Sequence, residues 1–165
     1  MQKAGNMHKR IRIALGATAS IILLIQFVPV DRGNPPVTSP IPLPDEVRAV
    51  VQQSCFDCHS NETRWPWYTY VAPVSWLVAH DVEEARGHVN FSEDGAMSAE
   101  DLAGLSKEIW EEVEEGEMPL PKYLLMHPDA RLTGEDKATL EGWAGSHADG
   151  ESSGHEHEDR HEYEE

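Results

Sequence analysis

The stretch SCFDCHSNETRWPWY, residues 54–68, contains the only two cysteines of the chain. Cys55 and Cys58 are separated by two residues, and His59 follows directly. This C-x-x-C-H spacing is the attachment signature of c-type haem. Two thiols on one helical turn can each add to a vinyl group of one haem, and the imidazole that follows can bind the iron. The motif therefore predicts one covalent haem c, with His59 as an iron ligand.

Other chemistries of two neighbouring cysteines fit the sequence less well. A thioredoxin-like redox pair would begin a helix within a βαβ pattern, and no strand pattern precedes Cys55. A structural zinc site would need further soft ligands, and there is no second cysteine pair. A disulfide between Cys55 and Cys58 would close a small, strained ring and would leave His59 without a role.

The second axial ligand of the iron is predicted to be Met118, in the segment EEGEMPLPKY. Pro119 and Pro121 stiffen this segment and could direct the thioether inward. His/Met ligation raises the redox potential and closes the iron to other ligands. The alternative is that Met118 only fills the core. His127 and His80 are the competing candidates for the sixth position.

An aromatic cluster follows the haem motif and could cover an apolar cofactor, or equally form an ordinary core. Arg64, at its start, could pair with a haem propionate or lie on the surface as a solvated charge. The cluster consists of Trp65, Trp67, Tyr68, Tyr70 and Trp76.

Residues 1–30 are predicted to form an N-terminal signal anchor, a transmembrane helix. The segment IRIALGATASIILLIQFVPV, residues 11–30, is apolar enough and long enough to span a bilayer, and basic residues precede it. The positive-inside bias then places the rest of the chain outside the cytoplasm. A cleaved signal peptide is the alternative, but the small residues GATAS precede the most hydrophobic stretch, whereas cleavage sites follow it.

The rest of the chain is predicted to hold one small all-α domain. Residues 31–44 are rich in proline and read as an extended spacer. Residues 45–147 contain four stretches with helical periodicity and no long alternation at period two, which indicates an all-α domain of about a hundred residues. Ser98 and Thr133 are expected to cap two of these helices, and Gly116 to end one of them. A large apolar cofactor would supply the interior that a domain of this size lacks.

Charge excludes one class of partner and suggests another. The formal charge of the chain is −17, and residues 31–165 carry −21, because four of the 13 basic residues and none of the 30 acidic residues precede residue 31. Nucleic-acid binding needs a cationic surface and is excluded. A redox partner with a basic docking patch is favoured instead. Residues 148–165 are predicted to be a disordered acidic tail, whose histidines could bind a metal only weakly: His155, His157 and His161.

Two stretches of the chain resemble the bacterial haem-binding domain family, whose members are similar to monohaem c-type cytochromes. They are CFDCHSNETRWPWYTYVAPVSWLVAHDVEEARGHVNFSE and MPLPKYLLMHPDARLTGEDKATLEGWA, and the resemblance covers about residues 40–145. The order Ala85-Arg86-Gly87 departs from the Gly-Arg pair expected there. The resemblance implies a haem held by Cys55, Cys58 and His59 in a fold similar to cytochrome c, and a bacterial source.

These observations lead to one main hypothesis and two alternatives. The main hypothesis is a one-electron carrier, anchored in the bacterial inner membrane with its haem domain in the periplasm. The first alternative is a haem-based sensor or ligand-binding module whose sixth ligand can be displaced. The second is a peroxidase-like enzyme, for which His80 or His127 would have to supply the acid–base group.

Overall fold

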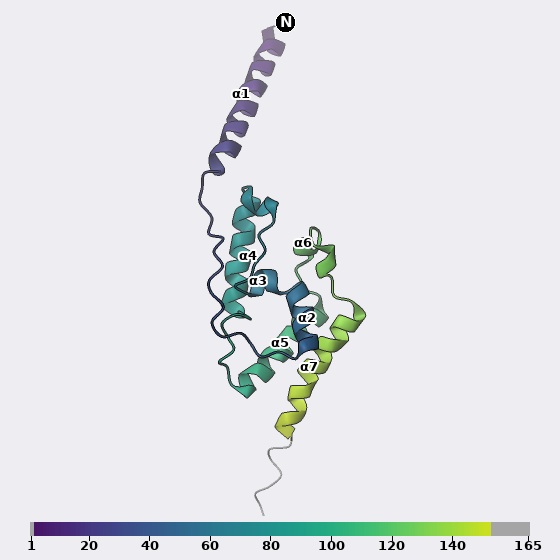
Figure 1. Cartoon of the computed structure of the whole chain (residues 1–165). Coiled ribbons are helices and arrows are strands. Elements are labelled where there is room, and N and C mark those ends of the chain that lie inside the picture. The colour runs from purple at the N-terminus through teal and green to yellow at the C-terminus, as the bar shows by residue number, and fades with distance from the viewer. Residues whose placement is uncertain (1, 153–165) are drawn as a thin grey trace, which may run out of the picture.

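The computed structural model describes residues 2–152, with side chains for residues 6–147, and all regular structure within this range is helical. The all-α prediction is therefore confirmed (Figure 1). The predicted tail begins inside the last helix, which continues to Ser152, and its three histidines lie outside the described residues.

The elements in chain order are α1 (Gln2–Ile25), α2 (Asp45–Ser54), α3 (Phe56–His59), the 3₁₀ turn η1 (Trp67–Tyr70), α4 (Val74–His88), α5 (Ala99–Glu115), α6 (Pro121–Leu124), the 3₁₀ turn η2 (Pro128–Ala130) and α7 (Gly134–Ser152).

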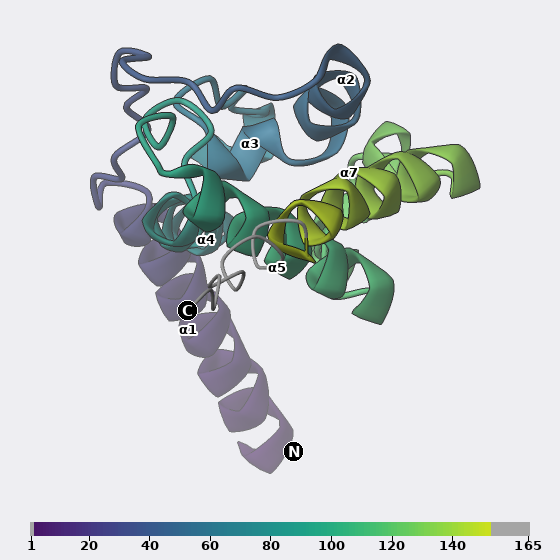
Figure 2. The same cartoon turned by 90° about the horizontal axis from the view of Figure 1, so that it is seen from below.

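Helix α1 projects away from the other helices (Figures 1 and 2). It ends at Ile25, so the apolar residues 27–30 of the predicted span are not helical, and it includes Lys9, Arg10 and Arg12. Among the residues that the structure describes, no helix is long and apolar enough to cross a membrane. The predicted transmembrane helix is thus not supported. Helix α1 contains the basic residues that precede the predicted span, and the last apolar residues of that span lie outside it.

The helix boundaries follow the capping residues that the sequence indicates. The Ser98 side chain accepts a hydrogen bond from the backbone N–H of Asp101, and the Asp101 carboxylate accepts one from the backbone N–H of Ser98. Thr133 and Asp136 form the same reciprocal pair at the start of α7. Gly116 ends α5 in the left-handed conformation, with φ of 80°, which favours glycine.

The hydrophobic core lies between α2, α5 and α7. Helix α5 packs along α7, and α2 also contacts α7 (Figure 2). Apolar residues of α2 and α7 supply the centre of this core. Its buried members are Ile41, Leu43, Val47, Val50, Val51, Val89, Phe91, Val113, Leu140 and Trp143.

The proline-rich segment before α2, predicted as an extended spacer, is bound to the domain, which its composition does not indicate. Ile41 is only 1% exposed, and its backbone N–H donates to the carbonyl of Phe91 at 3.0 Å. The N–H of Gly95 donates to the carbonyl of Ser39 at 2.7 Å. A Cβ at Gly95 would collide with the carbonyl of Pro40, so the close approach of these two segments requires glycine. The extended segment of residues 31–44 therefore packs against residues 91–95, and we call it the strap.

Candidate functional site

The two cysteines and the histidine lie on one helical turn. Cys55 stands between α2 and α3, and its carbonyl accepts hydrogen bonds from the N–H groups of Cys58 (3.1 Å) and His59 (2.9 Å). Both cysteines are free thiols. Burial raises the pKa of Cys55 to about 12 and contributes most to raising that of Cys58 to about 11. Both groups are therefore protonated near neutral pH, which disfavours a metal–thiolate site and leaves S–H bonds that can add across a double bond.

His59 is held in a fixed orientation by the chain that follows α4. Its Nδ1 lies 3.3 Å from the carbonyl oxygen of Val89, and because a carbonyl only accepts, Nδ1 carries the proton. The ring of Phe91 packs edge-to-face with the imidazole. Burial lowers the pKa of His59, so the ring is neutral at pH 7. Its Nε2 is left unprotonated, which is the state that binds a metal.

An apolar cavity of about 360 Å³ adjoins this turn. Cys58 lines it, whereas Cys55 and His59 belong to the same turn without lining it. Its walls come from the turn itself, from the aromatic segment after it, from α4 and from the segment around α6. The apolar lining residues are Trp65, Pro66, Trp67, Tyr68, Val74, Leu77, Val78, Val82, Leu120 and Met126.

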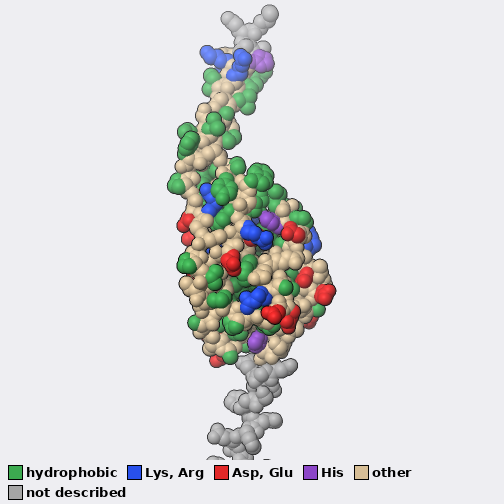
Figure 3. All heavy atoms as spheres, in the orientation of Figure 1, with side chains coloured by type: hydrophobic (Ala, Val, Ile, Leu, Met, Phe, Trp, Pro, Cys, Tyr) green, Lys and Arg blue, Asp and Glu red, His purple; other side chains and the backbone are tan. Residues whose placement is uncertain are grey.

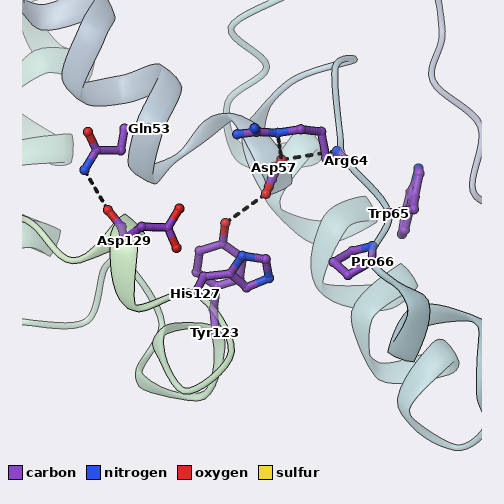
Figure 4. Close-up of a pocket in the computed structure, with 8 residues that line it drawn as sticks. All are labelled: Gln53, Asp57, Arg64, Trp65, Pro66, Tyr123, His127 and Asp129. Carbon is purple, nitrogen blue, oxygen red and sulfur yellow. Dashed lines mark hydrogen bonds and ion pairs between the residues drawn. The ribbon is translucent and has the colours of Figure 1, made fainter.

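A second, polar pocket of about 290 Å³ adjoins the apolar cavity (Figure 4). Six residues line both: Asp57, Arg64, Trp65, Pro66, Tyr123 and His127. Asp57, between the two cysteines, accepts a hydrogen bond from the Tyr123 hydroxyl at 2.9 Å. The backbone N–H of Arg64 donates to the same carboxylate at 3.2 Å, and its guanidinium approaches it at 3.6 Å. Burial is the main cause that raises the pKa of Tyr123, so this hydroxyl stays neutral. The pocket thus ties the haem motif to the α6 segment.

His127 lines both cavities, but its Nε2 is already engaged. The hydroxyl of Tyr68 lies 2.6 Å from Nε2, and the imidazole stacks on the ring of Tyr123 with the centroids 4.2 Å apart. A metal could bind this nitrogen only after the contact with Tyr68 is broken.

Neither of the two other candidates for the sixth position lines the cavity, although residues close to each of them in the sequence do. Met118 is half-buried after α5, its backbone N–H donates to the carbonyl of Glu112, and it does not line the cavity. His80 is exposed on α4, 3.6 Å from Glu84, and does not line it either. Met126, four residues along from Lys122, does line the cavity.

Trp65 provides a direct test of whether these residues fit an amphipathic cofactor. Its indole N–H is buried, and it has no hydrogen-bond partner among the described residues. An unsatisfied buried donor costs about 1–3 kcal/mol, so an acceptor is expected there. Trp65 lines the apolar cavity and the polar pocket, with Arg64 beside it. A flat apolar ring with carboxylates at its edge, as haem has, fits this arrangement.

Comparison with known proteins agrees with this chemistry. The sequence profile of the haem-binding domain family matches residues 20–146. The chain belongs to this family. The match includes the C-x-x-C-H turn, both cavity walls and most of α7. Haem is therefore the cofactor of this domain, and the predicted family is confirmed. Searches of curated proteins and of solved structures give no match.

Several residues of the site were not predicted from the sequence. Asp57 and Tyr123 form the hydrogen bond that joins the two walls. Tyr68 was expected in the aromatic cluster, but its contact with His127 was not. One signal was present: Tyr123 and His127 are four residues apart after two prolines, a spacing that allows their rings to stack on a helical turn. The pairing of Asp57 with Tyr123 spans 66 residues and leaves no local signal.

Proposed function

We propose that this protein is a monohaem c-type cytochrome that carries single electrons. The observation that carries this proposal is the C-x-x-C-H turn of free thiols beside an apolar cavity, in a member of the haem-binding domain family. When bound, haem supplies the exchange between Fe(II) and Fe(III). No other residue in the proposal needs to make or break a bond once the cofactor is attached.

The protein's own residues have separate roles in this proposal. Cys55 and Cys58 would hold the haem, each by adding its S–H bond across one vinyl group, with the sulfur bonded to one vinyl carbon as a thioether and the hydrogen to the other. His59 offers its neutral Nε2 to the iron, with Nδ1 fixed by Val89. Met118 is proposed as the sixth ligand, which requires its loop to move toward the cavity.

The proposed setting is the periplasmic face of a bacterial inner membrane. The basic residues of α1 and the apolar residues at its C-terminal end support an N-terminal anchor whose N-terminus lies in the cytoplasm. The charge of −21 on residues 31–165 favours weak, salt-sensitive docking of a redox partner with a basic patch.

A second candidate function is a haem-based sensor with an open or displaceable sixth position. The position of Met118 outside the cavity lining favours it, as does the hydrogen bond that engages His127. An iron with His59 alone would accept small ligands such as carbon monoxide.

Optical spectra of the full chain, matured by a c-type haem assembly system, decide between the two functions. An electron carrier with Met118 bound is expected to be low-spin in both oxidation states, with a weak band near the red end when oxidised. Carbon monoxide should leave its reduced spectrum unchanged. A high-spin spectrum, or one that shifts with carbon monoxide, would establish the sensor instead.

A further inference from the structure

One end of the haem domain exposes a group of large apolar side chains. Trp67, the most exposed of them, shows 73% of its surface. We call this group the aromatic patch, and it comprises Trp67, Tyr70, Val71, Val74, Trp76 and Leu77. It is formed by η1 and the first turn of α4. Exposed apolar groups of this density on a small domain mark an interaction surface.

The aromatic patch differs from the rest of the surface in charge. Residues 65–79, which contain the whole patch, include no charged side chain, in a chain with a formal charge of −17. In Figure 3, hydrophobic side chains gather at the end of the domain from which α1 leaves, and most acidic side chains on this face lie farther from α1. The patch residues themselves therefore offer no charge to an acidic partner or a nucleic acid, although the Arg32 guanidinium lies over the ring of Tyr70.

The end of α1 is fixed to this patch by specific contacts. The Gln26 side chain accepts a hydrogen bond from the N–H of Ala72 (2.9 Å) and donates one to its carbonyl (3.2 Å). The Arg32 guanidinium donates to the carbonyl of Thr69 and lies over the ring of Tyr70, 4.4 Å from its centroid. These contacts set the direction in which α1 leaves the domain.

Exposed apolar residues also stand on the α1 side of the contact between Gln26 and Ala72. Phe27, directly after Gln26, is 83% exposed. Exposed apolar residues continue up the helix: Ile21, Ile22, Leu23 and Leu24. An environment that covers this part of α1 therefore also reaches the patch.

We propose that the aromatic patch lies in the headgroup boundary of a lipid bilayer, beside α1. The proposal rests on the membrane anchoring in the proposed function. Tryptophan and tyrosine are enriched at this depth of a bilayer, since their rings are apolar and their N–H and O–H groups reach water. Trp67, Val74 and Leu77 also line the haem cavity. The apolar wall of the cofactor site therefore faces the membrane, and the acidic helices face away from it.

Photo-crosslinking to lipid tests this inference. The haem-loaded full chain is reconstituted into phosphatidylcholine vesicles that contain a lipid with a photoactivatable diazirine near its headgroup. After illumination, labelled peptides are identified by mass spectrometry. Label is expected on residues 67–77 as well as on α1. The substitution Val71→Glu should reduce labelling of residues 67–77 several-fold, because a carboxylate resists transfer into the boundary.

A matched variant controls for the added charge. Val37 is 48% exposed, against 46% for Val71, and it lies in the strap outside the patch, so Val37→Glu should leave labelling unchanged. Both variants are checked for an unchanged haem spectrum. Label on α1 but not on residues 67–77 would overturn the patch proposal while leaving the anchor intact. Absence of label from both segments would overturn the anchor and the patch together. Crosslinks from residues 67–77 to a second copy of the chain, with no lipid label on these residues, would overturn the patch proposal and show that a second copy covers the patch.

Discussion

Nδ1 of His59 lies 3.3 Å from the carbonyl oxygen of Val89, the residue that directly follows α4. This contact joins the haem motif to the far end of another helix, and it determines which imidazole nitrogen is free. Burial of the ring lowers the pKa of His59 and keeps that nitrogen unprotonated at pH 7. The packing of α3 against α4 therefore sets the orientation of His59, the proposed iron ligand.

Replacing His59 with alanine is expected to leave haem attached to the chain but to abolish the low-spin spectrum. The thioether bonds depend on Cys55 and Cys58, whereas the low-spin state depends on the imidazole. Absorption spectra of the oxidised and reduced variant measure this. His88→Ala, one residue before Val89 and exposed, is the control and should keep the normal spectrum. A His59→Ala variant with the same spectrum as the parent would remove His59 from the iron.

Replacing Met118 with leucine is expected to remove the weak red-end band and to let carbon monoxide bind the reduced protein. Leucine keeps the volume of the side chain but has no sulfur to offer the iron. Met126→Leu is the matched control, since Met126 lines the cavity and Met118 does not. If the band is lost in Met126→Leu and retained in Met118→Leu, the sixth ligand is Met126.

Replacing Trp65 with phenylalanine is expected to lower the midpoint potential of the haem. In the parent protein, the indole N–H is expected to donate to a haem propionate and to reduce its effective negative charge. Phenylalanine has no such donor, so the propionate would stabilise Fe(III) more strongly and the potential would fall. Redox titration followed by absorption measures the change. Trp110→Phe, on α5 and outside both cavities, should leave the potential unchanged. Equal potentials in the parent and Trp65→Phe would show that the indole N–H has a different acceptor.

Replacing Gly95 with alanine is expected to lower the free energy of unfolding by about 1–3 kcal/mol, because the new methyl group meets the carbonyl of Pro40. Denaturant unfolding followed by circular dichroism measures it. Gly104→Ala, on the exposed side of α5 with open space around it, should instead raise the free energy of unfolding by about 0.5–1 kcal/mol. A Gly95→Ala variant as stable as the parent would mean that the strap can leave the domain at little cost.

Features that depend on local sequence were predicted well. Ser98 and Thr133 cap their helices and Gly116 ends α5, as expected, because capping involves residues three or four apart. The haem motif is local for the same reason, and its three residues lie on one turn.

Features that depend on contacts between distant segments were not predicted. The composition of residues 31–44 describes an extended chain but not the surface to which it binds, and that surface is formed by residues 91–95. The hydrogen bond between Asp57 and Tyr123 likewise depends on how two loops approach each other. Ligation by Met118 remains a prediction, since the spacing of prolines around it does not determine where the loop points.

The most direct test of the central claim is the intact mass of the full chain after maturation by a c-type haem assembly system, measured under denaturing conditions. A covalent haem on Cys55 and Cys58 predicts a single species heavier than the polypeptide by the mass of one haem, and loss of that added mass in the double variant Cys55→Ser, Cys58→Ser. A parent chain with the mass of the bare polypeptide, from a preparation whose native spectrum contains haem, would show that the cofactor is bound without covalent attachment and would contradict the account.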